Sequence, residues 1–372
     1  MPSLDGSTLE GGGQLVRVAL ALSAITATPL HLYNIRANRA PPMRSGLKES
    51  HLAALHWLAD QTGASVEGAE LGSQDVKFRP RRRAGARTGV QKQQTGEHDA
   101  VNHRHRHHHT IELKKPGSVW LVLQAILPYA VFGMAKGEKR VDFTLTGGTN
   151  VDKSMSGEYV QQVMLPTLHK IGLPATVQVE IVKRGWACGV APEIGEVKVG
   201  GGLEGFQVVN RGEIEKISIS IVAHPESLRR QVIDKVTQQV GQRFKVPIVE
   251  AVVDEDSGHE SRFYLLLVAH SSHGWRIGRD FLGTGAKIRS AGQVERLVEE
   301  SVSRAVAALD TELRHGGCVD EHLQDQLVIF QALARGSSVV DAGIGRGDGT
   351  LHTQTVRWVC KEMLGEEECA GS

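Results

Sequence analysis

The feature that most constrains this chain is a segment near its N-terminus that is apolar on every side. Residues Leu15–Ile25 are apolar at almost every position, and Arg17 and Ser23 are the exceptions. A helix that is apolar all round has no face to offer to water, so it is buried. The fold must therefore place other elements on several sides of this helix, and a chain of 372 residues is long enough to do so.

Helix and strand patterns alternate along the rest of the chain. Helices are expected at 51–62, 119–132, 159–171, 293–309 and 323–334, and strands at 30–35, 66–78, 140–145 and 175–182. The rhythm of strand, helix and strand recurs, although no residue-level repeat accompanies it. It predicts an α/β (α+β) protein built from several similar units.

Two segments interrupt this rhythm. The first, 79–112, is rich in Lys, Arg and His, includes the run from His103 to His109 and has almost no apolar residue, so we expect a disordered loop. It is either a dispensable insertion, which we favour, or a contact for a metal or RNA. The second, 184–278, has its own strands and helix and is expected to be an inserted small domain. Residues 1–183 and 279–372 would then form one discontinuous large domain.

Composition limits the function classes. Lys and Arg number 43 and Asp and Glu 42, and this net charge of +1 argues against a protein that grips nucleic acid by bulk charge. No stretch is long and apolar enough to span a bilayer, and the N-terminus lacks a secretory pattern. The four cysteines lie far apart, which is typical of a reduced chain without structural zinc. We expect a protein of the nucleus (nucleoplasm) or cytoplasm that is not secreted.

The turn Glu10-Gly-Gly-Gly-Gln14 precedes the apolar helix. Glycines let a phosphate approach the backbone, and a helix N-terminus supplies unpaired N–H donors. A tight turn without a ligand explains the pattern as well, and is favoured when the pattern stands alone. Arg17 needs a carboxylate or an anion inside an apolar helix. Arg36, Arg39 and His51 add charge that is typical of a solvated loop or of a polyphosphate or RNA-phosphate site.

Two polar clusters lie toward the C-terminus. His352 stands at the start of an amphipathic helix, where a histidine is more often a cap or a surface residue than a catalyst. Asp325 and Gln326 come just before an apolar run. They could hold a ribose, a base or a metal-bound water, or they could cap that helix. These residues alone leave both interpretations open.

Six ordered blocks resemble the RNA 3′-terminal phosphate cyclase family. They are Leu4 to Arg17, Ile35-Arg-Ala-Asn-Arg39, Val66 to Ser73, Gly147-Gly-Thr-Asn150, Leu313 to Gln326 and Thr350-Leu-His-Thr-Gln-Thr355. All six run in the family's order. The resemblance implies a large domain of three repeated units, each with two helices on a four-stranded sheet, and a smaller α/β domain inserted into it.

The resemblance also implies an ATP-dependent reaction on RNA. A histidine takes AMP from ATP, the AMP passes to the RNA 3′-phosphate, and the 2′-OH closes a 2′,3′-cyclic phosphate as AMP leaves. In this chain the nucleophile aligns with His352, and Glu10 aligns with the residue beside a Mg²⁺ or Mn²⁺ ion. The implied partners are RNA 3′-phosphate ends and ATP, with no membrane.

The other site residues follow from the same resemblance. The nucleotide-binding set is Glu10, Gln14, Gln124, Tyr159, His322, Asp325 and Gln326, and the RNA- and phosphate-binding set is Arg17, Arg36, Arg39 and His51. The chain departs from the family's pattern at Ser50, at His322, where a tyrosine is common, and at Ser154–Ser156. The chief alternative is a relative that keeps the fold without catalysis and binds RNA or protein in ribosome assembly, but His352 favours the enzyme. An enolpyruvyl transferase would share the architecture but not these motifs.

Overall fold

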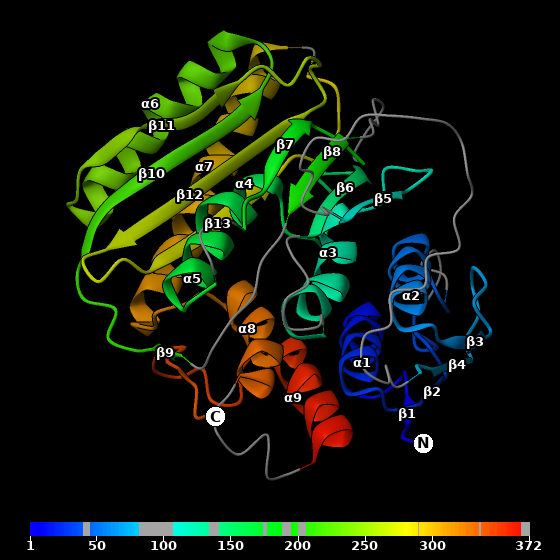
Figure 1. The fold of residues 1–372 in the computed structure, drawn as a ribbon. Helices are drawn as coiled ribbons and strands as arrows, with labels where there is room; N and C mark the ends of the chain where they lie inside the picture. The colour runs from blue at the N-terminus through cyan, green and yellow to red at the C-terminus, as the bar shows by residue number, and fades with distance from the viewer. Residues whose placement is uncertain are drawn as a thin grey trace, which may run out of the picture.

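The N-terminal part of the chain forms a unit of two helices and a four-stranded sheet (Figure 1). This computed structural model describes residues 1–39, 45–81, 107–133, 141–173, 177–187, 195–199, 206–288, 290–334 and 336–365. The elements of the first unit are β1 (Ser3–Asp5), α1 (Gly13–Thr26), β2 (Leu30–Tyr33), α2 (Glu49–Thr62), β3 (Ser65–Glu67) and β4 (Val76–Arg79). The strand order is β1-β2-β4-β3, in which only β1 and β2 run parallel.

A second unit repeats this arrangement. It consists of β5 (His107–Glu112), α3 (Val119–Pro128) with the π-helical turn η1 (Tyr129–Gly133), β6 (Val141–Gly147), the consecutive helical segments α4 (Gly157–Tyr159), η2 (Val160–Met164) and α5 (Leu165–Lys170), β7 (Glu180–Lys183) and β8 (Gly195–Val199). The order is β5-β6-β8-β7, and again only the first two strands are parallel. The predicted architectural repeat is therefore confirmed, although no residue-level repeat marks it.

The third unit consists of β9 (Gln207–Val208), α8 (Glu321–Leu333), β14 (Val339–Val340) and α9 (Leu351–Leu364). Strands β9 and β14 are parallel, as β1 and β2 are, but within the described residues they form a two-stranded sheet and not the four-stranded sheet expected for each unit. Helix α1 lies at the centre of the common core, where every residue from Gln14 to Ala24 is buried. It packs on α2, α3 and α9, which lies beside it in Figure 1. The prediction of a helix buried on all sides is thus confirmed.

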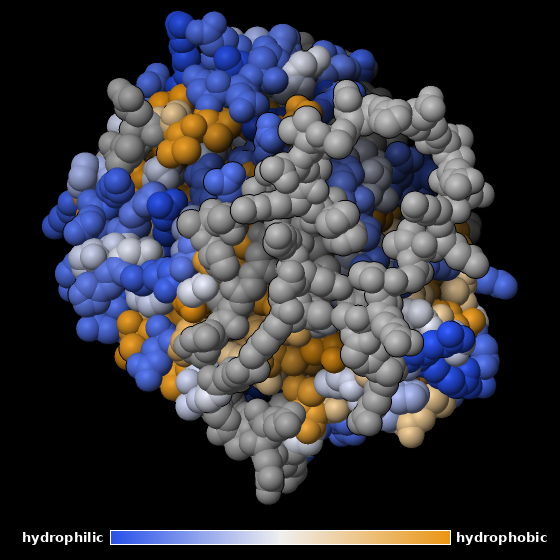
Figure 2. Space-filling model, viewed as in Figure 1, coloured by the Kyte–Doolittle hydropathy of each residue, from blue (hydrophilic) through white to orange (hydrophobic). Residues whose placement is uncertain are grey.

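A further sheet lies between β9 and α8 in the chain. Its elements are β10 (Ile214–Ala223), α6 (Glu226–Phe244), β11 (Ile248–Glu255), β12 (Phe263–Ser271), β13 (Arg276–Leu282) and α7 (Ala291–His315), with strand order β11-β10-β12-β13. One face of this sheet forms a second apolar cluster with α6 and α7. Hydrophilic residues cover its outer side in Figure 2. Across the described ranges, no helix combines the length and apolar character needed to cross a membrane.

The packing differs from the predicted domain boundaries in two places. Strands β8 and β9 lie inside the predicted insertion, 184–278, yet they pair with β6 and β14. Helix α7 lies outside those boundaries, yet it packs on α6, β12 and β13. An amphipathic stripe identifies a buried face but not the partner that covers it. We infer that the inserted unit lies between β9 and α8.

The end of the predicted disordered loop is also different. Residues 82–106 of the 79–112 segment lie outside the described residues, but 107–112 form β5, so this part of the prediction is wrong. The His109 ring stacks on Phe143 with 5.8 Å between centroids, and Ile111 is buried. His109 and Ile111 therefore pack inward while His108 and Thr110 are exposed, an alternation typical of a strand that the basic composition concealed.

Candidate active site

Three helices bring His352, Gln14 and Asp325 into one hydrogen-bonded chain. His352 Nδ1 lies 2.7 Å from Gln14 Oε1, and Gln14 Nε2 donates to Asp325 Oδ2 at 2.8 Å. The cap of α9 is Thr350, whose hydroxyl accepts a hydrogen bond from the backbone N–H of Thr353. His352 therefore does not cap this helix. His352 is exposed, whereas Gln14 and Asp325 are buried.

This chain of bonds fixes the proton on the His352 ring. Both Asp325 oxygens accept amide N–H groups, since Gln326 Nε2 donates to Oδ1 at 2.5 Å. The Gln14 nitrogen is therefore the group turned to Asp325, and its oxygen is left to accept from His352 Nδ1. In the neutral ring Nε2 then carries the free lone pair. Burial raises the pKa of Asp325, and the two amide donors oppose that rise.

Glu10 stands beside the first turn of α9. Its backbone N–H donates to Thr355 Oγ1 at 3.2 Å, and that hydroxyl donates to Leu351 O. One carboxylate oxygen pairs with Arg39, and the other, Oε2, is buried without a hydrogen-bond partner in the described part of the chain. A Cβ at Gly12 would overlap the Glu10 carboxylate, so a side chain there would displace that carboxylate from its present position.

Arg17 is buried in α1 with 8% of its surface exposed. Its Nε has no hydrogen-bond partner among the described residues. Burial lowers the pKa of the guanidinium to about 10, and the charges of Asp325 and Glu10 oppose that shift. A buried cation that is not fully satisfied is what an anion-binding site presents before its ligand arrives.

Further cations surround this point. Arg36 is buried, and its Nη1 donates to Gly46 O at 2.8 Å. Burial lowers the pKa of Lys48, and the nearby charges of Arg36, Arg39, Lys153 and Arg17 lower it further. Lys48 and Lys153 were not among the predicted site residues. The charged run around Lys48 was a signal for the first, but only the fold brings Lys153 from the second unit to the first.

His51 is a buried neutral base within these cations. Its Nδ1 accepts from the Lys48 backbone N–H at 3.1 Å, so Nε2 bears the proton. Burial lowers the pKa of His51 well below 6.5, and Arg17, Arg36 and Lys48 lower it further. Gly13 leaves room for the ring, because a Cβ there would overlap Nε2.

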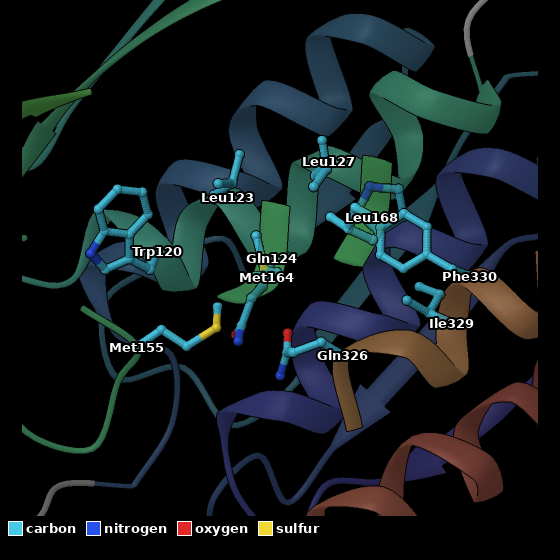
Figure 3. Close-up of a pocket in the computed structure, with 11 residues that line it drawn as sticks. Trp120, Leu123, Gln124, Leu127, Met155, Met164, Leu168, Gln326, Ile329 and Phe330 are labelled. Atoms are coloured by element: carbon cyan, nitrogen blue, oxygen red, sulfur yellow. The ribbon is translucent and has the colours of Figure 1, made fainter. Parts of the chain in front are cut away.

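A mostly apolar pocket adjoins the site (Figure 3). It is lined by Trp120, Leu123, Gln124, Leu127, Pro128, Met155, Met164, Leu168, Gln326, Ile329 and Phe330. Gln326 connects it to Asp325 through their hydrogen bond. Gln124 Oε1 is buried and lacks a hydrogen-bond partner within the described ranges. Two amides in an apolar wall suit the edge of a flat heteroaromatic ring. The cavity measures only about 20 Å³, room for about one water molecule, so a ring enters only when the lining side chains move.

Tyr159 and His322 lie differently from the other predicted nucleotide residues. Tyr159 is buried, and its hydroxyl donates a hydrogen bond at 2.5 Å to Oδ1 of Asp320, the residue that caps α8. Neither residue lines the pocket. His322 is exposed, one helical turn before Gln326, with its ring 6.3 Å from that of Tyr159. Ser156, where the chain departs from the family's pattern, has a structural role, because its hydroxyl accepts a hydrogen bond from the Tyr159 N–H and caps α4.

The sequence profile of the RNA 3′-terminal phosphate cyclase family matches residues 8–368. The chain belongs to this family. Proteins named RNA 3′-terminal phosphate cyclase include one from Desulfurococcus amylolyticus, 34% identical over 98% of this chain and 92% of the relative. Another is from Methylococcus capsulatus, 34% identical over 96% and 89%. A third is from Pyrococcus abyssi, 31% identical over 98% and 94%. The resemblance read from six blocks is confirmed, and this cyclase-family chain is an enzyme.

Proposed function

We propose that this protein is an ATP-dependent RNA 3′-terminal phosphate cyclase that works through a covalent histidine–AMP intermediate. The observation that carries the proposal is the hydrogen-bonded chain from His352 through Gln14 to Asp325. A nucleophilic histidine must present an unprotonated ring nitrogen at an exposed position next to cations. His352 is exposed and its Nε2 is left unprotonated by the Nδ1 hydrogen bond, and the cation Arg17 lies near Asp325 at the other end of the hydrogen-bonded chain.

The first step forms a bond between His352 Nε2 and the α-phosphorus of ATP, and the bond from that phosphorus to the bridging oxygen breaks, so pyrophosphate leaves. The proton stays on Nδ1. Gln14 Oε1 accepts a hydrogen bond from that N–H and so stabilises the positive charge that develops on the ring. Arg17 lies close enough to Asp325 and Glu10 for their charges to influence it. It supplies a cation to the negative charge spread over the phosphoryl oxygens.

Glu10 is the residue suited to a Mg²⁺ or Mn²⁺ ion. Its buried Oε2 has no hydrogen-bond partner in the described residues, which suits a metal ligand. No cluster of three or more His, Cys, Asp or Glu side chains that could hold a metal occurs in that part of the chain. Mg²⁺ is often bound by one carboxylate together with substrate phosphates, and such an ion would neutralise phosphate charge here.

The pocket between α3 and α8 is the proposed place for the adenine ring. Gln124 and Gln326 offer amide donors and acceptors to its edge, and Trp120, Pro128 and Phe330 offer apolar contact. His322, exposed and one helical turn before Gln326 on α8, would face the ribose.

The RNA enters from the cationic side. In the second step an oxygen of the RNA 3′-phosphate forms a bond to the AMP phosphorus and His352 leaves as a neutral ring. In the third step the 2′-oxygen bonds to the 3′-phosphorus, the bond from that phosphorus to the oxygen bridging it to AMP breaks, AMP departs, and the 2′-hydroxyl proton passes to water. Arg36, Arg39 and His51 are assigned to the RNA phosphate. The non-catalytic alternative is not favoured, because the nucleophile and its partners are all present.

Incubation of the full chain with α-labelled ATP and Mg²⁺ or Mn²⁺ tests the proposal. We expect covalent labelling on the peptide that contains His352, and loss of the label in His352→Ala. His56→Ala, which removes an exposed histidine from α2, is the matched control and should label normally. Labelling that persists in His352→Ala would overturn the assignment. A wild-type protein that binds RNA but never labels would support the non-catalytic alternative.

A further inference from the structure

The loop that leads into α9 has little rigidity of its own. Four of its residues are glycines with positive φ: Gly343, Gly345, Gly347 and Gly349. Glycine has the largest conformational freedom in the unfolded chain and contributes no side chain to hold a loop in place. Yet this loop ends at Thr350, two residues before His352. Other groups must fix it.

Part of the support comes from the end of α7. Gly343 and Gly316 form an antiparallel bridge, and the Ile344 N–H donates to His315 O at 2.7 Å. The His315 ring returns a second bond from Nδ1 to Ile344 O at 2.8 Å. A Cβ on Gly343 would overlap His315 O, so the two backbones touch directly. The loop is therefore docked on a helix of the inserted unit.

Arg346 makes the second connection, in a ring of four charges of which three are buried or nearly so and the fourth, Glu321, is 37% exposed. It pairs with Glu312 of α7, and its Nη1 lies 3.3 Å from Glu321 Oε2 of α8. Arg279 of β13 pairs with the same two glutamates, at 2.9 Å from Glu321 Oε1. The exposed fractions of the Glu312, Arg279 and Arg346 side chains are 3%, 8% and 11%. Each glutamate thus bridges two arginines, and the charges cancel.

The opposite side of the loop is bound to α9. Gln354 Nε2 donates to Gly349 O at 3.1 Å, and Arg357 Nη1 donates to Asp348 O at 2.9 Å. Movement of the loop would therefore move the first turn of α9. A continuous set of contacts runs from the inserted unit through Arg346 to the turn that carries His352.

We propose that Arg346 is a positioning residue for His352, held in place by Glu312 of the inserted unit and by Glu321. The inference rests on the proposed function to the extent that His352 is the nucleophile. Arg346 sets the orientation of the first turn of α9, so that Nδ1 meets Gln14 while Nε2 faces the substrate. The inserted unit thereby supports the catalytic helix.

The first measurement is the rate at which AMP labels His352. Arg346→Gln should lower the labelling rate at saturating ATP at least tenfold and leave the KM for ATP within about twofold, because the ATP-binding residues are untouched. Arg346→Lys, which keeps the charge but not the planar fork, should recover part of the rate. Arg230→Gln removes an exposed ion pair on α6 and is the matched control, with a rate near that of the wild type.

The second measurement does not depend on activity. Hydrogen exchange of the full chain without nucleotide should be faster in residues 351–356 of Arg346→Gln, and unchanged there in Arg230→Gln. Folded Arg346→Gln protein that labels at the wild-type rate, or whose α9 exchanges normally, would overturn the proposal. If Arg346→Gln does not fold, the labelling rate and the hydrogen exchange of residues 351–356 are measured on Arg346→Lys and Glu321→Gln instead. If the wild type never labels, the proposed function fails, while the exchange comparison still decides whether Arg346 holds α9.

Discussion

Helices α1 and α3 occupy equivalent places in the first two units, and only one of them carries charge. Each follows the first strand of a sheet with the same strand order and pairing. The cap of α1 is Gly12, which has no side chain, whereas the cap of α3 is Ser118, whose hydroxyl accepts from the Leu121 N–H. The N-terminus of α1 therefore has no side-chain cap of its own and lies against the Glu10 carboxylate, whereas the N-terminus of α3 is capped by its own residue.

The next positions continue the contrast. The second residue is Gln14 in α1 and Trp120 in α3, and the fifth is Arg17 in α1 and Leu123 in α3. The first pair faces His352 and the cations, whereas Trp120 and Leu123 line the apolar pocket. The same topology thus provides the proposed phosphate site in one unit and the proposed pocket for a ring in the other. A few side chains at equivalent positions make the difference.

The largest effect is expected from adding one methyl group at the N-terminus of α1, and the same addition near the N-terminus of α3 is the comparison. In Gly13→Ala the new Cβ would overlap His51 Nε2 and lie 2.9 Å from Arg17 Nη1, so buried groups of the site must shift. We expect AMP labelling to fall about 100-fold, as for a displacement near 1 Å. Gly117→Ala is the control beside the N-terminus of α3, one residue before the cap Ser118, where the Cβ would meet Leu113 Cδ1 at an acceptable 3.4 Å. Equal losses in both variants would break the comparison.

Arg17→Leu gives α1 the residue that α3 has at the same position. We expect labelling to fall about 100-fold or somewhat less, because one phosphate-facing cation is lost. The free energy of unfolding should stay within about 1 kcal/mol of the wild type or rise, since removal of a poorly satisfied buried charge is often neutral or stabilising. Urea denaturation checks the second point. A large loss of stability would make Arg17 a structural residue instead.

The smallest effect concerns pH. The second helices of the two units, α2 and α4, differ at their third residue, which is His51 in α2 and Tyr159 in α4. Burial raises the pKa of Tyr159 well above 10, so Tyr159 does not titrate near neutral pH. Burial keeps the pKa of His51 well below 6.5. Between that lowered pKa and pH 6.5 the unfolded chain therefore binds a proton that the folded chain does not. Stability from this group is present above pH 6.5 and is lost as the pH falls, by about 1.4 kcal/mol per pH unit.

Urea denaturation of His51→Asn at several pH values between 5 and 7.5 tests this expectation. Below pH 6.5 the free energy of unfolding of the variant should fall less steeply with pH than that of the wild type, by about 1.4 kcal/mol per pH unit, the slope that one proton contributes. His56→Asn, at an exposed position of the same helix, should keep the wild-type slope. Identical slopes for all three proteins would show that His51 does not titrate as its burial requires.

Much of the fold could be predicted from the sequence because its signals are local. The apolar run of α1, the helical periods of α2 and α8, and the alternating units depend on residues a few positions apart. The wrong prediction, for residues 107–112, came from judging a histidine-rich run by composition. Its strand is stabilised by pairing with β6, which lies far along the chain from the run.

The candidate site was predictable as a set of residues but not as an arrangement. The sequence by itself determined family membership and the residues His352, Gln14 and Asp325, because they lie in contiguous blocks. Only the tertiary structure decided that Gln14 orients the histidine, that Tyr159 is turned to a helix cap, and that α7 supports the loop before α9. The physical reason is distance in sequence. Periodicity identifies which face of an element is buried, whereas the partner on that face is chosen by the packing of segments hundreds of residues apart.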